Sequence, residues 1–216
     1  MIIETPRMRL HPVSASDIDD LVLLDSDPEV MRHVSGGLPT ARAEITDWVL
    51  PRAQSHLRSA RGGLWVARHR QSGRFLGWVS LRHPRHSSRS ELELSYRLAR
   101  RWWGRGLATE AADALIAVAF GTMGAERIFA TTTAANIGSR RVMEKLGMFV
   151  TWVAVPADDA DPDLAEVEYE LARVHWELGQ APTIPIRRIV TDRRAPGGRH
   201  RLATTSEFTF IATGAG

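Results

Sequence analysis

Apolar and polar residues alternate along three consecutive stretches in the middle of the chain, and this period of two predicts three β-strands. The predicted strands cover residues 64–68, 75–81 and 91–98. The third alternates strictly, and its two faces hold Leu92, Leu94, Tyr96 and Leu98, and Glu91, Glu93, Ser95 and Arg97. Because the connections between the three stretches are short, we expect these strands to pair antiparallel.

Apolar residues recur at helical spacing on either side of these strands. A broad apolar stripe predicts a helix over residues 106–123, and a second helix is expected over 137–146, ended by Gly147. Before the strands, the pattern predicts three helical segments, over residues 17–24, 28–33 and 40–60. Pro51 lies inside the last of these and is expected to kink or split it.

Further strands are predicted at residues 5–10, 127–132, 148–155 and 167–176, and an acidic loop precedes the last of them. The order is then strand, helices, three strands, helix, strand, helix and two strands. This order predicts an α+β (mixed α/β) domain with helices packed over a central sheet.

The character of the chain changes at Gly179, after which proline, arginine and glycine are frequent. We therefore expect one domain over residues 1–178 and a partly flexible extension over 179–216. Within the extension, residues 204–213 predict a lone strand that would pair with a sheet edge in its own chain or in a second copy. The second option leaves a homodimer open.

Composition and charge exclude several classes of protein. Without cysteine, disulfides, a cysteine nucleophile and thiolate metal sites are excluded, and the scattered histidines predict no metal site. The net charge is +3, and the arginines are spread along the chain without a basic stripe, so we expect no nucleic-acid partner. No apolar run approaches the roughly 20 residues that span a bilayer, and the N-terminus lacks a secretory signal, which predicts a cytoplasmic protein.

One short segment carries a clear chemical signal. Gly104 and Gly106 lie between arginines, at the junction of an apolar strand and an Ala-rich helix. We call residues 101–106 the Gly loop. Glycine allows a close backbone approach, and the helix start that follows presents N–H groups without partners, so the loop predicts a site for a phosphate or pyrophosphate. It lacks the Lys-Ser/Thr pair of a P-loop and the three-glycine spacing of a dinucleotide fold. A tight turn without a ligand is the alternative.

Several separated motifs resemble one family. Their members are Arg101-x-x-Gly104-x-Gly106, Glu93-Leu94-Ser95-Tyr96-Arg97-Leu98, Asn136-x-x-Ser139 with the helix to Met148, and Thr5-Pro6-Arg7-Met8-Arg9-Leu10 with Asp27-Pro28-Glu29. In order and spacing they resemble the GNAT superfamily of acetyl-CoA-dependent N-acyltransferases, and its RimJ/RimL-like (ribosomal-protein-alanine N-acetyltransferase-like) branch. The resemblance covers residues 3–177. It implies a mostly antiparallel, twisted central sheet with a splayed parallel strand pair and helices on both faces.

The resemblance also implies where acetyl-CoA binds. The strand ending at Leu98 would diverge from the strand over 127–132, and the pantetheine arm would lie in the gap with the pyrophosphate on N–H groups of residues 103–109. The residues implied to contact the cofactor are Tyr96, Arg97, Leu98, Arg101, Trp103, Gly104, Arg105, Gly106, Leu107, Ala108, Thr109, Asn136 and Arg140. For Trp102 and Trp103, packing of the loop is the alternative to covering the cofactor. For Arg140 and Arg141, a solvated helix face is the alternative to a phosphate contact.

Catalysis in this family requires a base, because a primary amine is mostly protonated near neutral pH. The resemblance assigns that role to Glu93, with a solvated charge at the sheet edge as the alternative for Glu93 and Glu91 alike. It assigns protonation of the leaving thiolate to Ser139, while a plain helix-surface serine remains an alternative. Tyr96 is either a core residue or a general acid, and water is a third proton source.

The sequence therefore predicts an acetyl-CoA-dependent N-acetyltransferase that moves the acetyl group to a primary amine by direct attack in a ternary complex. The RimJ/RimL resemblance favours the α-amine of a protein N-terminus as acceptor. A small-molecule amine, such as an amino acid or an antibiotic, and a catalytically silent acyl-CoA sensor are the alternatives.

Overall fold

The computed structural model describes residues 1–59, 62–84, 87, 89–155, 162–179 and 187–190. Its strands are β1 (Ile3–Glu4), β2 (Met8–Pro12), β3 (Gly62–His69), β4 (Phe75–Arg82), β5 (Glu91–Leu98), β6 (Arg127–Thr133), β7 (Phe149–Val155), β8 (Glu166–Ala172) and β9 (Arg187–Val190). Its helices are α1 (Ile18–Asp25), α2 (Pro28–Ser35), α3 (Arg42–Glu44), α4 (Leu50–Arg58), α5 (Leu107–Gly121), α6 (Ile137–Lys145) and α7 (Arg173–Leu178), with 3₁₀ turns at Ala15–Asp17, Arg100–Trp102 and Pro162–Leu164.

The described strands form one mixed sheet in the order β1-β2-β3-β4-β5-β6-β8-β7-β9. The three central strands predicted from the alternating pattern pair antiparallel, as expected. Two neighbouring pairs are parallel, β5 with β6 and β7 with β9. The strand predicted at residues 5–10 begins only at Met8, as β2, because residues 5–7 form the turn between β1 and β2, in which the Thr5 N–H donates to the Met8 carbonyl.

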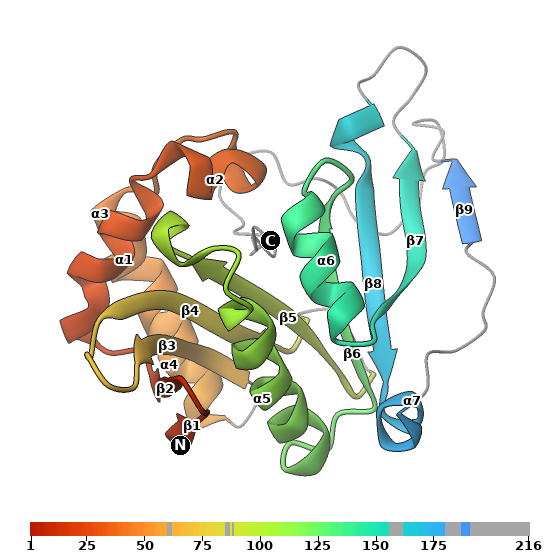
Figure 1. The fold of residues 1–216 in the computed structure, drawn as a ribbon, viewed down its shortest axis with the longest axis horizontal. Coiled ribbons are helices and arrows are strands. Elements are labelled where there is room, and N and C mark those ends of the chain that lie inside the picture. Colours follow the sequence, from red (N-terminus) through yellow and green to blue (C-terminus); the bar gives the residue numbers. More distant parts are fainter. Residues whose placement is uncertain (60–61, 85–86, 88, 156–161, 180–186, 191–216) are drawn as a thin grey trace.

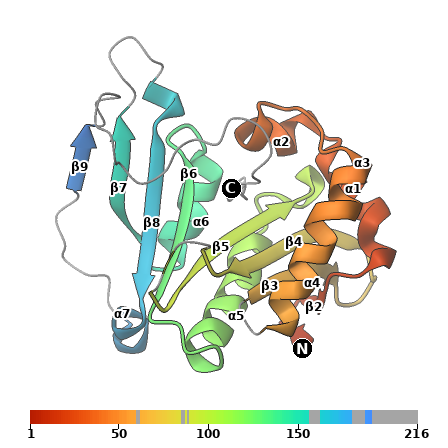
Figure 2. The same ribbon diagram turned by 180° about the vertical axis from the view of Figure 1, so that it is seen from behind.

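Helices cover both faces of this sheet, which confirms the α+β architecture. On one face α5 and α6 pack over the inward side chains of β4 and β5 and form the larger core, with Leu81, Leu94, Tyr96 and Leu115 among its members. On the other face α1, α2 and α4 enclose a smaller core around Val66 and Trp78. Figure 1 and Figure 2 show the N-terminal helices on one half of the molecule and α6 on the other.

The strands β5 and β6 separate near the middle of the sheet. Their parallel register has three partners, Glu91–Arg127, Leu92–Ile128 and Glu93–Phe129, although β5 continues to Leu98. Figure 1 shows the two ribbons diverging from that point. The pairing of β5 with β4, in contrast, extends from Glu93 to Leu98. The splayed parallel pair that the family resemblance implied is therefore present, and the separation begins immediately after Glu93.

The helical stretch before β3 is not split at Pro51, where the sequence predicted a kink or a split; it changes from π-helical to α-helical geometry just before that residue. Residues Ile45–Val49 form a π-helical turn between α3 and α4, and Pro51 lies in the first turn of α4. Proline has no backbone N–H, so it removes one hydrogen bond from this helical stretch. The π turn joins the two helices without a break.

The end of β8 corrects the sequence prediction. A strand was expected to continue to residue 176, but β8 ends at Ala172 and residues 173–178 form α7. Val174 and Trp176 keep a spacing of two, which suggested a strand, but they are one position out of phase with Val167, Tyr169 and Leu171. In the structure Trp176 packs on Phe120 with ring centroids 5.3 Å apart. This contact favours a helical turn that folds back onto α5.

The C-terminal segment is described in part. Residues 187–190 form β9 beside β7, while the strand predicted at residues 204–213 lies outside the described residues, as does most of the acidic loop before β8. Among the described residues, no helix combines the length and the apolar character needed to cross a bilayer.

Candidate functional site

The Gly loop leads directly into the long helix α5. Gly104 and Gly106 both adopt left-handed backbone angles, with φ of 70° each, which glycine adopts without a Cβ penalty. The first intrahelical bond of α5 runs from the Glu110 N–H to the Gly106 carbonyl. The N–H groups of the residues between them therefore have no acceptor within the helix. They lie at the positive end of a 15-residue helix dipole, which favours an anion.

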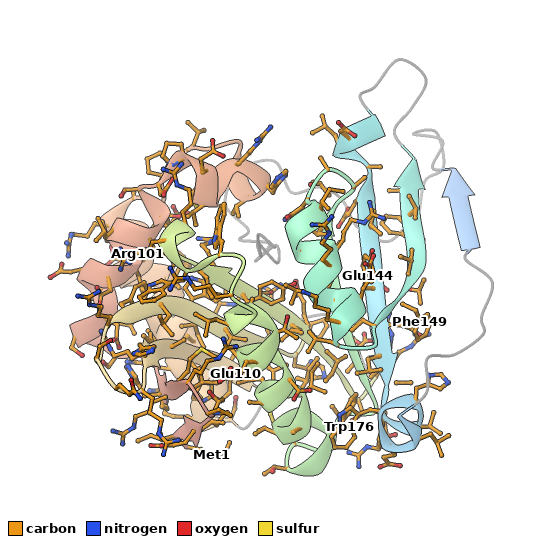
Figure 3. All side chains as sticks on the ribbon, viewed as in Figure 1. Met1, Arg101, Glu110, Glu144, Phe149 and Trp176 are labelled. Atoms are coloured by element: carbon orange, nitrogen blue, oxygen red, sulfur yellow. The ribbon has the colours of Figure 1, made fainter. Side chains whose placement is uncertain are left out.

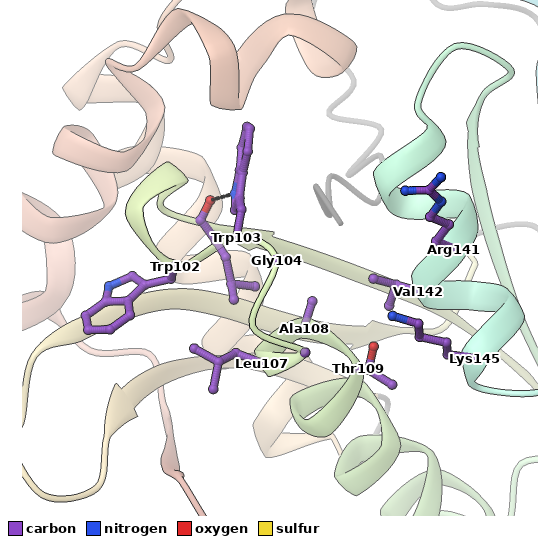
Figure 4. A pocket seen from close by; sticks show the side chains of 11 residues that line it. Trp102, Trp103, Gly104, Leu107, Ala108, Thr109, Arg141, Val142 and Lys145 are labelled. Carbon is purple, nitrogen blue, oxygen red and sulfur yellow. Dashed lines mark hydrogen bonds between the residues drawn. The ribbon is translucent and has the colours of Figure 1, made fainter.

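A pocket lies beside this helix start and extends to α6. It comprises about 420 Å³ of empty space that is partly open to solvent. Its lining consists of Leu98, Trp102, Trp103, Gly104, Gly106, Leu107, Ala108, Thr109, Arg141, Val142 and Lys145. Figure 4 shows α5 and α6 on opposite sides of this space. Seven residues predicted to contact the cofactor line it, namely Leu98, Trp103, Gly104, Gly106, Leu107, Ala108 and Thr109.

The cations at this pocket come from α6 and differ from the predicted one. Arg141 and Lys145 are four residues apart, so they share a helix face, and that face borders the pocket (Figure 4). Arg140 was predicted to contact the cofactor, but its guanidinium donates to the Tyr169 hydroxyl and to the Ala134 carbonyl, both at 3.1 Å. Helical periodicity explains the difference, because adjacent residues point about 100° apart.

The two arginines of the Gly loop also differ from the expectation. Arg101 and Arg105 were expected to supply charge to an anion, but their guanidinium groups lie over the Trp102 ring, 5.9 and 5.2 Å from its centroid. Neither lines the pocket. Trp102 itself donates to the Phe75 carbonyl and stacks on His69, so it packs the outer side of the loop.

Trp103 connects the loop to the end of β5. Its indole N–H donates to the Leu98 carbonyl at 2.7 Å, and the ring stands at the edge of the pocket (Figure 4). The Ala99 N–H donates to Leu76, which continues the ladder between β4 and β5. In an antiparallel ladder the N–H and C=O groups of every second residue point to the same neighbouring strand. Those of Ala99 point to β4, so those of Tyr96 and Leu98 point to the side of β6.

Arg97 is placed differently from its neighbours, which corrects the expectation that its backbone contacts the cofactor. The same alternation points the N–H and C=O groups of Arg97 toward β4. Its side chain is buried on the face of the N-terminal helices, where it forms an ion pair with Asp25 at 2.5 Å and lies 5.2 Å from the Trp78 ring centroid. A buried arginine with a single carboxylate partner stabilises the contact between β5 and α1 as long as both charges are present.

Three predicted residues meet beneath the start of α6. The Asn136 side chain accepts a hydrogen bond from the Ser139 N–H at 3.1 Å, as expected for a helix N-cap. The Tyr96 hydroxyl lies 3.1 Å from both the hydroxyl and the carbonyl of Ser139. Tyr96 and Ser139 are fully buried, so Ser139 is not a surface serine. Burial raises the pKa of the Tyr96 phenol well above its ordinary value, and it stays protonated at any physiological pH.

The two glutamates of β5 lie on the opposite face from Tyr96, and neither is a solvated edge charge. Glu93 is 6% exposed, and Arg82 contacts its Oε2 through both Nε and Nη2. Glu91 accepts from Ser87 and from Arg127, whose guanidinium also reaches Glu168 and Glu170. Although desolvation opposes it, these partners hold the pKa of the Glu91 carboxyl below its ordinary value. Glu91 is thus part of an ion-pair network.

The residues of this region are compatible with an extended, phosphorylated cofactor. A helix start and two cations face one pocket, and Leu98, which lies beyond the last β5–β6 pair, lines the same pocket. The divergence begins at Glu93, so a carboxylate lies at one end of the region and phosphate-binding groups at the other. In the described part of the chain, no group of His, Asp or Glu side chains is arranged to hold a metal ion.

Sequence reasoning missed Lys145 as a pocket residue and left Arg141 open between a phosphate contact and a solvated helix face. Their i, i+4 spacing is visible in the sequence, but the orientation of α6 relative to the Gly loop is not. The buried ion pair of Arg97 with Asp25 was also missed, since no local signal links two residues 72 positions apart.

Comparisons with known proteins identify the family to which this fold is similar. The family model described as "Acetyltransferase (GNAT) domain" matches residues 7–149. A curated relative from Aspergillus fumigatus, FsC-acetyl coenzyme A-N(2)-transacetylase, is 28% identical over 194 residues, which cover 84% of this chain and 80% of the relative.

Solved structures agree with that family match. A GNAT-family acetyltransferase from Bacillus anthracis superimposes with a TM-score of 0.67 at 20% identity, over 81% of this chain and 99% of that one. RimL, a ribosomal L7/L12 α-N-protein acetyltransferase solved with coenzyme A, superimposes with a TM-score of 0.67 at 13% identity, over 80% and 98%. At these identities the likeness concerns the fold.

Proposed function

This chain belongs to the GNAT acetyltransferase family, and from that premise we propose that it transfers the acetyl group directly to a primary amine in a ternary complex. As a family member it is an acetyl-CoA-dependent acetyltransferase. One observation supports direct transfer in a ternary complex. The β5–β6 pairing ends at Glu93, and beyond it a pocket is lined by residues from Leu98 to the start of α5.

The Gly loop and α6 would hold the phosphates of acetyl-CoA. The N–H groups at the start of α5 are suited to the pyrophosphate, and Arg141 and Lys145 add two positive charges on the other side of the pocket. The pantetheine arm would follow the side of β5 that faces β6, beyond the last β5–β6 pair. When bound, acetyl-CoA supplies an activated thioester. The chain supplies the positions of its phosphates and arm.

Glu93 is the group best placed to accept the proton of the amine. It lies at the last pair before the strands separate, on the face covered by the N-terminal helices. Arg82 contacts one carboxylate oxygen and thereby fixes the orientation of the group. We assign the acceptor to this face, opposite to the face on which α5 and α6 lie.

The Tyr96 and Ser139 hydroxyl groups are the candidates for stabilising the leaving sulfur. They are buried side by side at the start of α6, and the raised pKa of the Tyr96 phenol keeps its proton available for donation. Asn136 fixes this helix start through its hydrogen bond to the Ser139 N–H. Their roles are those of hydrogen-bond donors to a thiolate, with no covalent enzyme intermediate.

The proposed class of acceptor is based on the names of two similar proteins. The name of the Aspergillus relative describes acetyl transfer to an N(2) nitrogen, and that of RimL describes transfer to the α-amine of a ribosomal protein. Both are amino nitrogens. We therefore propose a primary amine, and a protein N-terminal α-amine and a small-molecule amine are the two classes to compare.

The proposal is tested by the release of the CoA thiol from acetyl-CoA in the presence of amines. The panel contains N-terminal peptides that begin with Ala or Ser, free amino acids, and amine-bearing antibiotics, each blocked in a matched control by prior N-acetylation. We expect thiol release that depends on one class of free amine and equals the amide formed, measured by mass spectrometry. CoA binding without amine-dependent release for any class would identify an acyl-CoA sensor.

A further inference from the structure

The N-terminal residues Thr5 and Arg7, about 100 positions away in sequence, form hydrogen bonds to the Gly loop and to the start of α5. The Arg7 guanidinium donates through Nη1 to the Arg105 carbonyl at 2.7 Å and through Nε to Glu110 Oε2 at 2.6 Å. The Arg7 backbone N–H donates to the other Glu110 oxygen at 2.9 Å. Thr5 adds a hydrogen bond to the same oxygen. One side chain thus binds both the loop and the first turn of α5, where Figure 3 labels Glu110.

This contact determines the orientation of one peptide group of the loop. The Arg105 carbonyl and the Gly106 N–H belong to the same peptide unit, and in a trans peptide these two groups point in opposite directions. None of the described peptide bonds is cis. Since Arg7 holds the carbonyl, the Gly106 N–H is directed away from Arg7. Gly106 lines the pocket between α5 and α6.

We propose that Arg7 is a positioning residue for the phosphate site, in that it fixes the Arg105–Gly106 peptide with its N–H toward the pocket. This inference rests on the proposed binding of the CoA pyrophosphate at the Gly loop. The residues that bind the anion directly are the loop and the start of α5. Arg7 acts through them, and Glu110 keeps its guanidinium in place.

Glu110 is suited to that task because it stays ionised. Desolvation alone would raise its pKa, but hydrogen bonds from Thr5, from the Arg7 backbone and from the Arg7 guanidinium outweigh this and hold the pKa below its ordinary value. The ion pair is therefore intact at neutral pH. It weakens as the pH falls below the ordinary range of a glutamate and the carboxyl becomes protonated.

A contribution to global stability alone is a poor explanation for this arrangement. The Arg7 side chain is 46% exposed, and ion pairs with that much solvent contact contribute little to folding. Arg9, two residues along in β2, offers a matched control. It is 56% exposed, its ion pair is with Glu4 at 3.6 Å, and it does not line the pocket.

The test compares two ligands by calorimetry, CoA and pantetheine, because pantetheine lacks the phosphates. The proteins are the full chain, Arg7→Ala, Arg7→Lys and Arg9→Ala. We expect Arg7→Ala to weaken CoA binding about tenfold and to leave pantetheine binding within twofold, as for the loss of one well-placed charge-assisted hydrogen bond. Arg7→Lys, which keeps the charge but not the fork, is expected to lie between, and Arg9→Ala to match the full chain.

Each outcome has a distinct meaning. An equal loss for both ligands in Arg7→Ala would show a general structural role and overturn the proposal. An undiminished preference for CoA in Arg7→Ala would overturn it as well, while leaving the phosphate site in place. If the unaltered chain bound CoA no better than pantetheine, the phosphate site itself would be wrong, and the role of Arg7 with it.

Discussion

Glu93→Gln is expected to bind CoA with unchanged affinity and to lose about 10²–10⁴-fold in kcat, the range attributed to a positioned general base. The substitution keeps the size of the side chain and its hydrogen bond from Arg82, but the amide cannot accept the proton of the attacking amine. The loss should be largest at low pH, where more of the amine is protonated. Steady-state kinetics with a saturating amine, from pH 6 to 9, measure it.

Glu91→Gln is the matched control for this experiment. Glu91 lies two residues earlier on the same face of β5, and its carboxylate is bound by Ser87 and Arg127. We expect its kcat to stay within about threefold of the unaltered chain. Thermal unfolding of both variants separates lost stability from lost catalysis. An unchanged rate in Glu93→Gln, or an equal fall in both variants, means that Glu93 is not the base.

The double substitution Arg141→Ala with Lys145→Ala is expected to weaken CoA binding by about 10–100-fold. Each side chain faces the pocket from α6, and a charge-assisted hydrogen bond to phosphate contributes about 1.5–3 kcal/mol. The two effects can be less than additive because the side chains are neighbours. The dissociation constant should also depend less on salt, since two screened attractions are removed. Calorimetry at 50 and 300 mM salt measures both effects.

Arg140→Ala distinguishes this arrangement from the one predicted by sequence. Its guanidinium is engaged by Tyr169 and Ala134, away from the pocket. We expect CoA binding within twofold of the unaltered chain. A larger loss of CoA affinity in Arg140→Ala than in the double variant would show that Arg140, not Arg141 or Lys145, contacts the phosphate.

Local patterns predicted most of the fold. The alternation in residues 91–98 identified β5 and its two faces, and Gly147 ended α6 as expected. The prediction failed at residues 173–176, where Val174 and Trp176 keep the spacing of two but are out of phase with the strand that ends at Ala172. The tertiary contact between Trp176 and Phe120 decides that case, and no local signal encodes it.

The candidate site shows a similar division. The Gly loop and the Asn136 cap followed from residue type and spacing, and the separation of β5 from β6 followed from the family resemblance. The placement of charged side chains did not follow, because long side chains choose partners across the fold. Arg101 and Arg105 lie over Trp102, Arg97 pairs with Asp25, and the pocket receives its cations from α6 instead.

The most direct test of the central claim is a crystal structure of the protein with CoA bound. We expect pyrophosphate oxygens at about 2.9 Å from N–H groups of residues 104–109. We also expect phosphate contacts from Arg141 or Lys145, and the pantetheine arm between β5 and β6 with its sulfur near Tyr96 and Ser139. CoA bound elsewhere, or an arm that does not enter between these strands, would contradict this claim.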